Sequence, residues 1–242
     1  MLQITRYLNS NQLIPSYKSA YLKGHSCETA LLKVTTDTQK LVAQNKMVIL
    51  MQLDVSAAFD TIDSSILIDL LRRKYGFCGT ALRWIKSYLT DRTFTAKIKR
   101  TKSGIILLVY GVPQGSILGP LLFILYISDL PEVVAKHEIK MPGYADDSEL
   151  YHGFDCKDVN SYSSAFEKVT NCLSDIEVWM KKHYLQLNVS KTEVLFIGKP
   201  SIHSIAIQAD MKFQVGDEFF TPSPVQNVRS LHSGPNQGVR RN

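Results

Sequence analysis

Two adjacent acidic residues, Asp146 and Asp147, are the residues of this sequence most suited to chemistry. They follow Tyr144-Ala145 in a short turn between two segments with the pattern of strands, Glu138–Gly143 and Ser148–Gly153. Adjacent carboxylates repel each other, and a divalent cation is the usual group that offsets the repulsion. Acidic pairs also occur in solvated turns, because Asp suits turn backbones. The pair alone leaves a metal site and a solvated turn as alternatives.

A third carboxylate, Asp54, lies at the end of the apolar run Met47–Val55, which has the composition of a buried strand. If this strand lies beside the acidic hairpin in one sheet, Asp54 meets Asp146 and Asp147. Three carboxylates suit two Mg²⁺ ions, and two ions about 4 Å apart can hold both the attacking and the leaving oxygen of a phosphoryl transfer. Asp54 suits a cap on the following turn equally well, so both roles stay open at this point.

The elements that must position these acids can be predicted from apolar spacing and capping residues. A two-residue turn at Ala145-Asp146 needs positive φ, so backbone strain is expected there. The expected helices are a short piece within Met1–Gly24, Ser26–Gln44 with Ser26 as N-cap, a helix from Asp63 or Ser64 through Tyr75, Thr80–Thr90, a buried helix Ser116–Leu130 and Lys157–Tyr184. The expected strands are a hairpin of Phe94–Lys99 with Ile105–Val109 across a turn at Lys102-Ser103-Gly104, then Thr192–Ile197 and short strands within Ile202–Phe220.

The composition is that of a globular chain with a modest basic excess. Of the 242 residues, 45% are hydrophobic, and Lys plus Arg outnumber Asp plus Glu by 28 to 22. This excess fits a polyanionic partner without requiring one. The four cysteines have no metal-ligand spacing, which predicts free thiols in a reducing compartment. With neither a signal-peptide pattern nor a membrane-spanning run, the chain is expected to be intracellular, in the cytoplasm or nucleus.

Five segments occur in a fixed order around the acidic residues. They are Lys23–Leu31, Leu53–Thr61, Gly111–Leu121, Tyr144–Asp147 and Leu187–Glu193. The last four resemble motifs A, B, C and D of reverse transcriptases, and the first resembles the segment before motif A in non-LTR retrotransposons of the jockey-like kind. The match covers about Tyr17 to Gly198. It implies an RNA-directed DNA polymerase that uses two Mg²⁺ ions, or Mn²⁺ as a substitute, to join dNTPs to a DNA primer on an RNA template.

The resemblance implies an α+β fold, the right-hand polymerase palm, with an antiparallel sheet and helices packed on one face. Residues 1–46 are expected to be partial fingers, 47–198 the palm, 199–229 an extension toward a thumb that is missing, and 230–242 a disordered tail. No membrane contact is expected, and the oligomeric state is not predicted. Two other functions remain as alternatives. One is a catalytically inactive retroelement remnant that at most binds nucleic acid, and the other is a different palm-type nucleotidyl transferase, against which the motif A and B segments argue.

The resemblance also assigns site residues. The metals would be held by Asp54, Asp146, Asp147 and the carbonyl of Val55, and Phe59 would exclude a 2′-hydroxyl from the incoming sugar. The nucleotide and template–primer cleft would be lined by Gln114, Gly115 and Tyr144. Lys191 would lie near the triphosphate as a charge partner or proton donor. The residues by themselves allow plainer interpretations. Phe59 suits an ordinary core position, Gln114-Gly115 a turn into a helix, and Lys191 a solvated surface.

Overall fold

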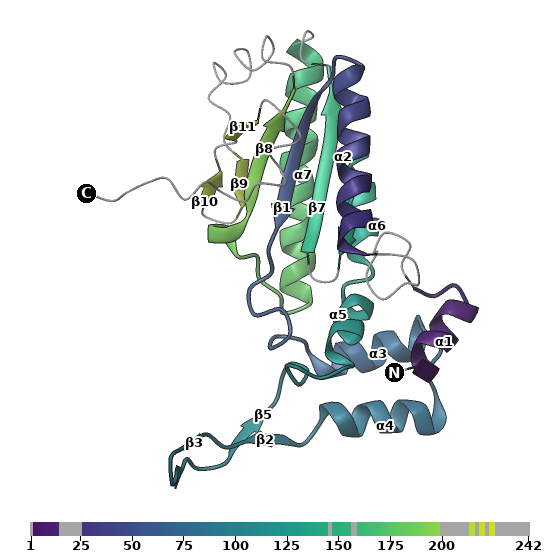
Figure 1. Cartoon of the computed structure of the whole chain (residues 1–242), viewed down its shortest axis with the longest axis vertical. Helices are drawn as coiled ribbons and strands as arrows, with labels where there is room; N and C mark the ends of the chain where they lie inside the picture. Colours follow the sequence, from purple (N-terminus) through teal and green to yellow (C-terminus); the bar gives the residue numbers. More distant parts are fainter. Residues whose placement is uncertain are drawn as a thin grey trace.

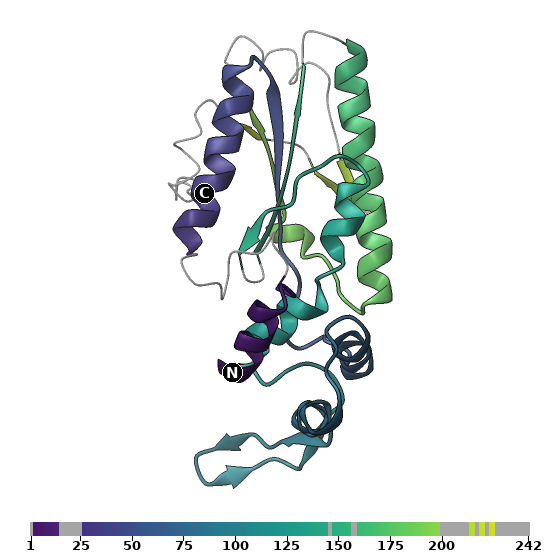
Figure 2. The same cartoon turned by 90° about the vertical axis from the view of Figure 1, so that its right-hand side faces the viewer.

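A five-stranded sheet with helices on both faces forms the larger part of the molecule (Figures 1 and 2). The structure, a computed structural model, describes residues 2–14, 26–144, 147–155, 159–198, 213–215, 218–220 and 223–225. The strands, in their order across the sheet, are β11 (Ser223–Val225), β8 (Glu193–Ile197), β1 (Met47–Leu53), β7 (Asp147–Phe154) and β6 (Gly143–Tyr144). All neighbours are antiparallel except β11, which runs parallel to β8. The strand that leads to Asp54 is therefore central.

The central strand β1 is buried on both faces, which decides how the helices are arranged. Val48 and Leu50 pack with α2 (Cys27–Ala43), whereas Met47, Ile49 and Met51 belong to the apolar cluster that includes α7 (Val159–Lys182). Figure 2 shows α2 and α7 on opposite sides of the sheet. The α+β palm is thus present, but the prediction that helices pack on one face is wrong. An uninterrupted apolar strand needs cover on both faces, because alternate side chains point to opposite sides.

Side-chain caps begin two helices where the sequence predicts them. At the start of α2, Ser26 accepts a hydrogen bond from the backbone N–H of Thr29, whose hydroxyl in turn accepts from the Ser26 N–H. The Asp63 carboxylate accepts from the N–H groups of Ser65 and Ile66 at the start of α3. The remaining helices are α1 (Leu2–Ser10), α3 (Ser64–Arg73), α4 (Gly79–Leu89), α5 (Gly119–Tyr126), α6 (Leu130–Ala135) and the short η1 (Val189–Lys191).

Two predicted elements are shorter than expected, and proline explains both. The single helix expected over Ser116–Leu130 is wrong, since α5 ends at Tyr126 and α6 starts after a turn. Pro131, in the first turn of α6, lacks the N–H that a continuous helix would need. The strand expected over Glu138–Gly143 is also wrong. Pro142 cannot donate to a ladder. Before β6, this segment is joined to β7 by a bridge at Lys140 and by the Glu149 N–H, which donates to the Pro142 carbonyl at 3.1 Å.

A protruding hairpin, here called the arm (residues 92–110), continues from α4 (Figure 1). Its strands are β2 (Arg92–Phe94) paired with β5 (Ile106–Leu108), and β3 (Lys97–Ile98) paired with β4 (Thr101–Lys102). The turn predicted at Lys102-Ser103-Gly104 is wrong, because the register puts it at Lys99-Arg100, where Lys99 has φ +55°. Apolar alternation misled the prediction, since both arm strands are largely exposed and no buried face fixes the register.

Several predictions fall wholly or partly outside the described residues. The expected strain at Ala145-Asp146 and the expected tail 230–242 lie outside them. Of the strands expected within Ile202–Phe220, β9 (Phe213–Val215) and β10 (Glu218–Phe220) form an antiparallel pair, and residues 202–212 lie outside the described part. Phe213 is buried and its ring stacks on Phe166 of α7 at 4.8 Å. Among the described helices, none has the length and apolar character needed to cross a membrane.

One buried tyrosine joins α2 to the sheet and leads to a pH prediction. The Tyr151 hydroxyl donates to the Asp37 carboxylate at 2.5 Å, and this bond is the main cause that lowers the pKa of Asp37 below its ordinary value. A lowered carboxyl pKa stabilises the fold above the unfolded-state pKa of about 4, and the contribution is lost as the pH falls through the folded-state pKa. Tyr151→Phe is therefore expected to cost about 1 kcal/mol at neutral pH. In urea unfolding, the difference from the wild type should shrink at acid pH; a difference that stays constant would contradict the assignment.

Candidate active site

The end of β1 is held by the loop that precedes β8. Two backbone hydrogen bonds of 2.8 Å join them, from the Ser56 N–H to the Gln186 carbonyl and from the Asn188 N–H to the Asp54 carbonyl. Val55 lies between these two bonds, opposite Leu187 of the loop. The Val55 carbonyl accepts neither of the two bonds. The segment resembling motif D is thus fixed against the segment resembling motif A.

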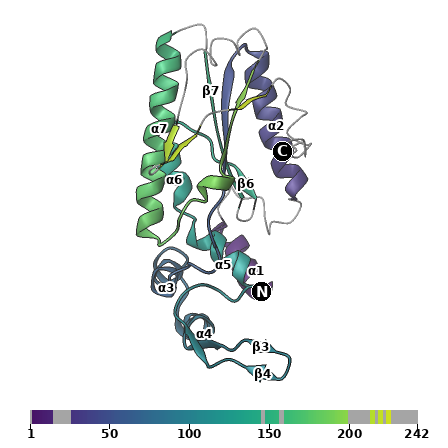
Figure 3. The same cartoon turned by 90° about the vertical axis from the view of Figure 1, so that its left-hand side faces the viewer.

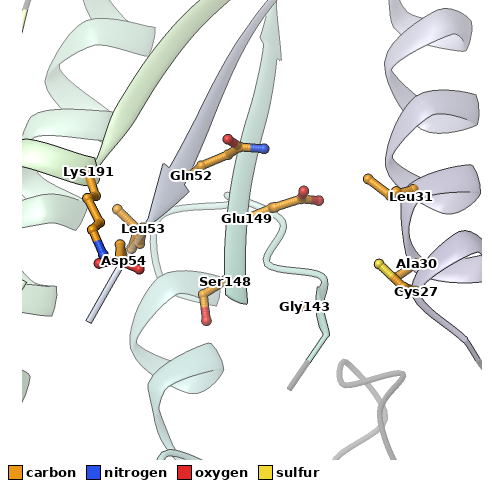
Figure 4. A pocket seen from close by; sticks show the side chains of 10 residues that line it. All are labelled: Cys27, Ala30, Leu31, Gln52, Leu53, Asp54, Gly143, Ser148, Glu149 and Lys191. Carbon is orange, nitrogen blue, oxygen red and sulfur yellow. The ribbon is translucent and has the colours of Figure 1, made fainter. Parts of the chain in front are cut away.

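A cavity of about 290 Å³ opens between this strand end and the first turns of α2 (Figure 4). Asp54 and Lys191 both line it, and in Figure 4 the Lys191 side chain extends toward the Asp54 carboxylate. Gln52 and Glu149, which lie opposite each other on β1 and β7, line it from the sheet. The structure therefore brings Asp54 and Lys191 to one cavity, and Asp54 is half-buried at the cavity wall.

The strand register sets the backbone of residue 147 next to this site. The β1–β7 ladder runs from Met47 opposite Phe154 to Leu53 opposite Ser148, so one further step sets Asp54 opposite residue 147. Within the hairpin, Tyr144 pairs with residue 147, which leaves two residues between the strand ends, as predicted. Residues 145 and 146 lie outside the described part of the chain, and for 144 and 147 the backbone alone is described.

The segment resembling motif B packs directly on the turn that follows Asp54. The N–H of Gly111 donates to the Ile62 carbonyl at 2.8 Å, and the N–H of Val112 donates to the Phe59 carbonyl at 2.7 Å. Gly111 has φ +81°, and a Cβ added to it would lie 2.8 Å from backbone atoms of Phe59 and Asp60. No other residue type fits this approach without a shift of backbone.

The predicted residues Phe59, Gln114 and Gly115 lie around this contact, and none of them is among the residues that line the cavity with Asp54 and Lys191. Gln114 donates from Nε2 to Oδ2 of Asp60 at 2.7 Å. Gly115 has φ +71°, and among the described residues no atom lies within 4 Å of an added Cβ, so its backbone conformation accounts for the glycine. Phe59 is half-buried, with its ring 5.4 Å from that of Phe123. It is therefore partly a core residue and partly exposed.

Two residues important for this geometry were missed by the sequence prediction. Asp60 orients Gln114, although 54 positions separate them. Arg92 donates to the carbonyls of Leu89, Tyr110 and Gly111, and so ties the base of the arm to motif B. Neither contact follows from spacing or periodicity. A correct register for the hairpin would have indicated the contact of Arg92, because it places Arg92, at the start of β2, opposite Leu108, at the end of β5.

Of the predicted metal ligands, the structure describes Asp54, Val55 and the backbone of residue 147. No group of three His, Cys, Asp or Glu side chains suited to a metal occurs among the side chains that the structure describes. Of the predicted carboxylates, Asp54 alone belongs to that set, and Asp146 lies outside the described residues. What is described does fit a hard cation. The Asp54 carboxylate lines a cavity, and the neighbouring Val55 carbonyl is not engaged by the bridge to the loop.

Comparison with known sequences decides the family. Residues 2–227 match the family described as reverse transcriptase (RNA-dependent DNA polymerase). The chain belongs to the reverse transcriptase family. It is 26% identical over 190 residues to the "Probable RNA-directed DNA polymerase from transposon BS" of Drosophila melanogaster, covering 76% of this chain and 20% of that protein. It is 26% identical over 183 residues to the polymerase from mobile element jockey of the same fly, covering 74% and 19%.

These relatives confirm the predicted resemblance to reverse transcriptases of jockey-like non-LTR retrotransposons. This reverse transcriptase chain spans about one fifth of the length of the curated relatives it matches. Among solved structures, it resembles telomerase from Candida tropicalis with a TM-score of 0.59 at 15% identity, covering 81% of this chain and 34% of that one. Telomerase from Candida albicans gives a TM-score of 0.56 at 18% identity, covering 80% and 33%. At these identities the likeness supports the fold alone, which is the predicted α+β palm.

Proposed function

We propose that this chain supplies the catalytic palm of an RNA-directed DNA polymerase that joins dNTPs to a primer 3′-hydroxyl on an RNA template. One observation carries the proposal. Backbone hydrogen bonds join the loop of motif D to residues 54–56 at the end of β1, and motif B to residues 59 and 62 of the turn that follows Asp54. We further propose that residues 47–198 form the palm, 1–46 part of the fingers, and 199–229 a connection toward a thumb.

In this proposal, Asp54, Asp146, Asp147 and the Val55 carbonyl hold two Mg²⁺ ions. When bound, the ions would neutralise charge on the attacking and leaving oxygens of the phosphoryl transfer. The chain's own contribution is positioning, because phosphoryl transfer needs little covalent chemistry from the protein. The bond from the Asn188 N–H to the Asp54 carbonyl holds the strand end rigidly, which keeps the carboxylate at the cavity wall.

Lys191 is proposed to act on the triphosphate. Its side chain extends into the same cavity as Asp54, where an ammonium group can pair with phosphate oxygens or donate a proton to the leaving pyrophosphate. Lys191 is exposed, as the plainer interpretation of a lysine in solvent requires, and its place in the lining of this cavity supports the phosphate role. Its position on η1, directly after the loop bonded to residues 54–56, ties its placement to that of the carboxylate.

The sugar and template contacts are proposed for Phe59, Gln114, Gly115 and Tyr144. The Phe59 ring is braced from one side by Phe123, so it can resist displacement by a 2′-hydroxyl. Since Gln114 donates its amide N–H to Asp60, its amide oxygen is left to accept from a sugar or base. The open space beside Gly115 leaves room for substrate.

Primer extension on an RNA template tests the proposal directly. The wild-type chain is assayed with Mg²⁺ and with Mn²⁺, alongside Asp146→Asn, which has nearly the same shape without the charge. Extension by the wild type that is lost in the variant supports the polymerase. Absence of extension by a folded wild type at high protein concentration supports the alternative, a remnant that at most binds nucleic acid.

A further inference from the structure

The second strand of the arm has an open edge without the usual protections. β5 pairs with β2 on one side, and no other strand that the structure describes lies on its other side. Residues 103–112 contain neither a charge nor a proline, whereas the first half of the arm carries Arg92 and Lys97. Edge strands are usually protected by charged side chains or proline, because their unpaired backbone groups attract another strand. β5 is therefore the edge of the arm that is open to a further strand.

The side chains along this edge are apolar and exposed. Ile105, Leu107 and Val109 share one face of the ribbon by alternation, and their exposed fractions are 77%, 61% and 60%. Ile106, on the other face, is 50% exposed. A contiguous exposed apolar surface of this kind marks an interaction site. A two-stranded ribbon is also marginal on its own, so a partner that adds strands at β5 would stabilise the arm.

Charges of opposite sign lie at the two ends of the arm. The tip, residues 97–102, carries four Lys and Arg residues and no acid. At the base, Asp91 directly precedes the arm, and the backbone of Asp60 lies against Gly111, the residue that follows it. Both acids are exposed. Within the part of the chain that the structure describes, neither the tip cations nor these two acids form an ion pair.

We propose that two copies of this chain pair through β5, edge to edge and antiparallel about a two-fold axis near Leu107, so that two ribbons form one four-stranded sheet. An interface of this symmetry uses the same surface on both copies. Antiparallel pairing separates the two basic tips and brings each toward Asp60 and Asp91 of the other copy, whereas parallel pairing would set the tips side by side. The inference goes beyond the proposed function, since pairing needs neither nucleic acid nor catalysis.

A second copy fits this edge better than other occupants. The occupant must be apolar in the middle, acidic where it meets the tip and basic where it meets the base. An antiparallel copy of the arm has its residues in this order. A polyanion would neutralise the tip and leave the uncharged edge of β5 uncovered. A strand of another protein would cover that edge, but it would need the same order of charges to match both ends.

Pairing through β5 leaves the carboxylate site open. The arm extends from the end of the molecule away from the sheet, with β3 and β4 at its tip (Figures 1 and 3). The cavity that Asp54 and Lys191 line lies between β1 and α2, which take no part in the contact. Because few residues pair, the interface is at the small end of specific interfaces, and the dimer is expected to be weak.

Analytical ultracentrifugation of the whole chain, treated with nuclease and kept in EDTA, measures the pairing. We expect the wild type to be monomeric at about 1 μM and largely dimeric at about 200 μM. Leu107→Glu should weaken the dimer at least about tenfold, since two carboxylates then meet near the axis, and Leu107→Lys should do the same with two ammonium groups. An equal mixture of these two variants should restore pairing, because unlike charges then meet.

Thr93→Glu is the matched control. Thr93 lies directly opposite Leu107 on β2, so the variant adds the same charge to the same face, away from the open edge. It should change the dissociation constant by less than about threefold. Circular dichroism should be the same for the wild type and all three variants, because both positions are exposed.

A cysteine scan tests the antiparallel arrangement. In a background without the native cysteines 27, 78 and 156, single cysteines are oxidised with copper phenanthroline in air, and the linked dimer is measured for Ile105→Cys, Ile106→Cys, Leu107→Cys, Leu108→Cys and Val109→Cys. A disulfide requires two Cα atoms within about 7 Å. In an antiparallel pair only the residue nearest the axis faces its own copy, so the yield should have one maximum and fall on either side. A parallel pair would link at every position.

Several outcomes would overturn the proposal. They are a wild type that stays monomeric at the highest concentration, equal losses for Leu107→Glu and Thr93→Glu, a mixture of the charged variants that stays monomeric, and uniform cross-linking along the scan. A dimer that nuclease removes would show that nucleic acid bridges the copies, which would also overturn it. Asp54→Asn should pair as the wild type does, whatever its effect on primer extension, which separates this inference from the catalytic one.

Discussion

Asp54→Asn should lower primer extension by at least about a thousandfold if the chain is the proposed polymerase. Asparagine keeps the shape of the side chain, so the half-buried strand end and its bond from the Asn188 N–H should survive. It removes the negative charge that a hard cation requires, and electrostatic stabilisation is usually the largest contribution to such catalysis. The measurement is single-turnover primer extension with saturating dNTP, compared with the wild type at the same protein concentration.

Two controls separate the loss of a metal ligand from a general effect of charge and from unfolding. Asp69→Asn removes the same charge from the exposed face of α3, where Asp69 pairs with Arg73, and should change extension by less than twofold. Urea unfolding should show that Asp54→Asn keeps its stability to within about 1 kcal/mol of the wild type. If a folded Asp54→Asn protein retained more than a tenth of the wild-type rate, Asp54 could not be the essential ligand.

Gly111→Ala should destabilise the fold by about 3 kcal/mol or more, because two separate penalties coincide there. An alanine must adopt φ +81°, which costs about 1–2 kcal/mol. Its Cβ must also lie where backbone atoms of Phe59 and Asp60 stand 2.8 Å away, so the turn after Asp54 has to move. Urea or thermal unfolding monitored by circular dichroism measures the effect.

Two other glycines isolate the two penalties. Gly115→Ala carries the positive φ, at +71°, with no described atom within 4 Å of the added Cβ, and should cost about 1 kcal/mol. Gly104 has no positive φ, and no described atom lies within 4 Å of an added Cβ, so Gly104→Ala should be nearly neutral. The expected order of stability is Gly104→Ala, then Gly115→Ala, then Gly111→Ala. Equal losses at residues 111 and 115 would show that the contact with the turn carries no cost.

Local patterns in the sequence predicted the elements well where a single rule applied. Ser26 was predicted as one cap and Asp63 or Ser64 as another, because Ser and Asp satisfy the free N–H groups of a first turn, and the structure has Ser26 and Asp63. The apolar run of β1 predicted a buried strand, but a period of two cannot say which helix covers which face. In the arm, apolar and polar residues alternate although both strands are largely exposed. The alternation therefore did not indicate how the two strands pair, and their register was predicted wrongly.

For the site, motif resemblance predicted the residues and could not predict their contacts. Asp54 and Lys191 were named from their motifs, and the structure brings them to one cavity. The hydrogen bond between Gln114 and Asp60, and the clamp formed by Arg92, depend on tertiary placement that no local spacing encodes. The roles of Asp146 and Asp147 as metal ligands remain predictions.

The position of β1 at the centre of its sheet has a consequence for the order of folding. α2 and β1 are neighbours in the chain, joined by a turn at residues 44–46, so they can associate early. The strand partners of β1 arrive much later, since Met47 pairs with Phe154 and Val48 with Ile197. During synthesis on the ribosome, β1 therefore lacks β7 until residue 154 has emerged and β8 until residue 197 has emerged. The carboxylate site is among the last parts to form, and chaperone protection of this apolar strand should matter most in that interval.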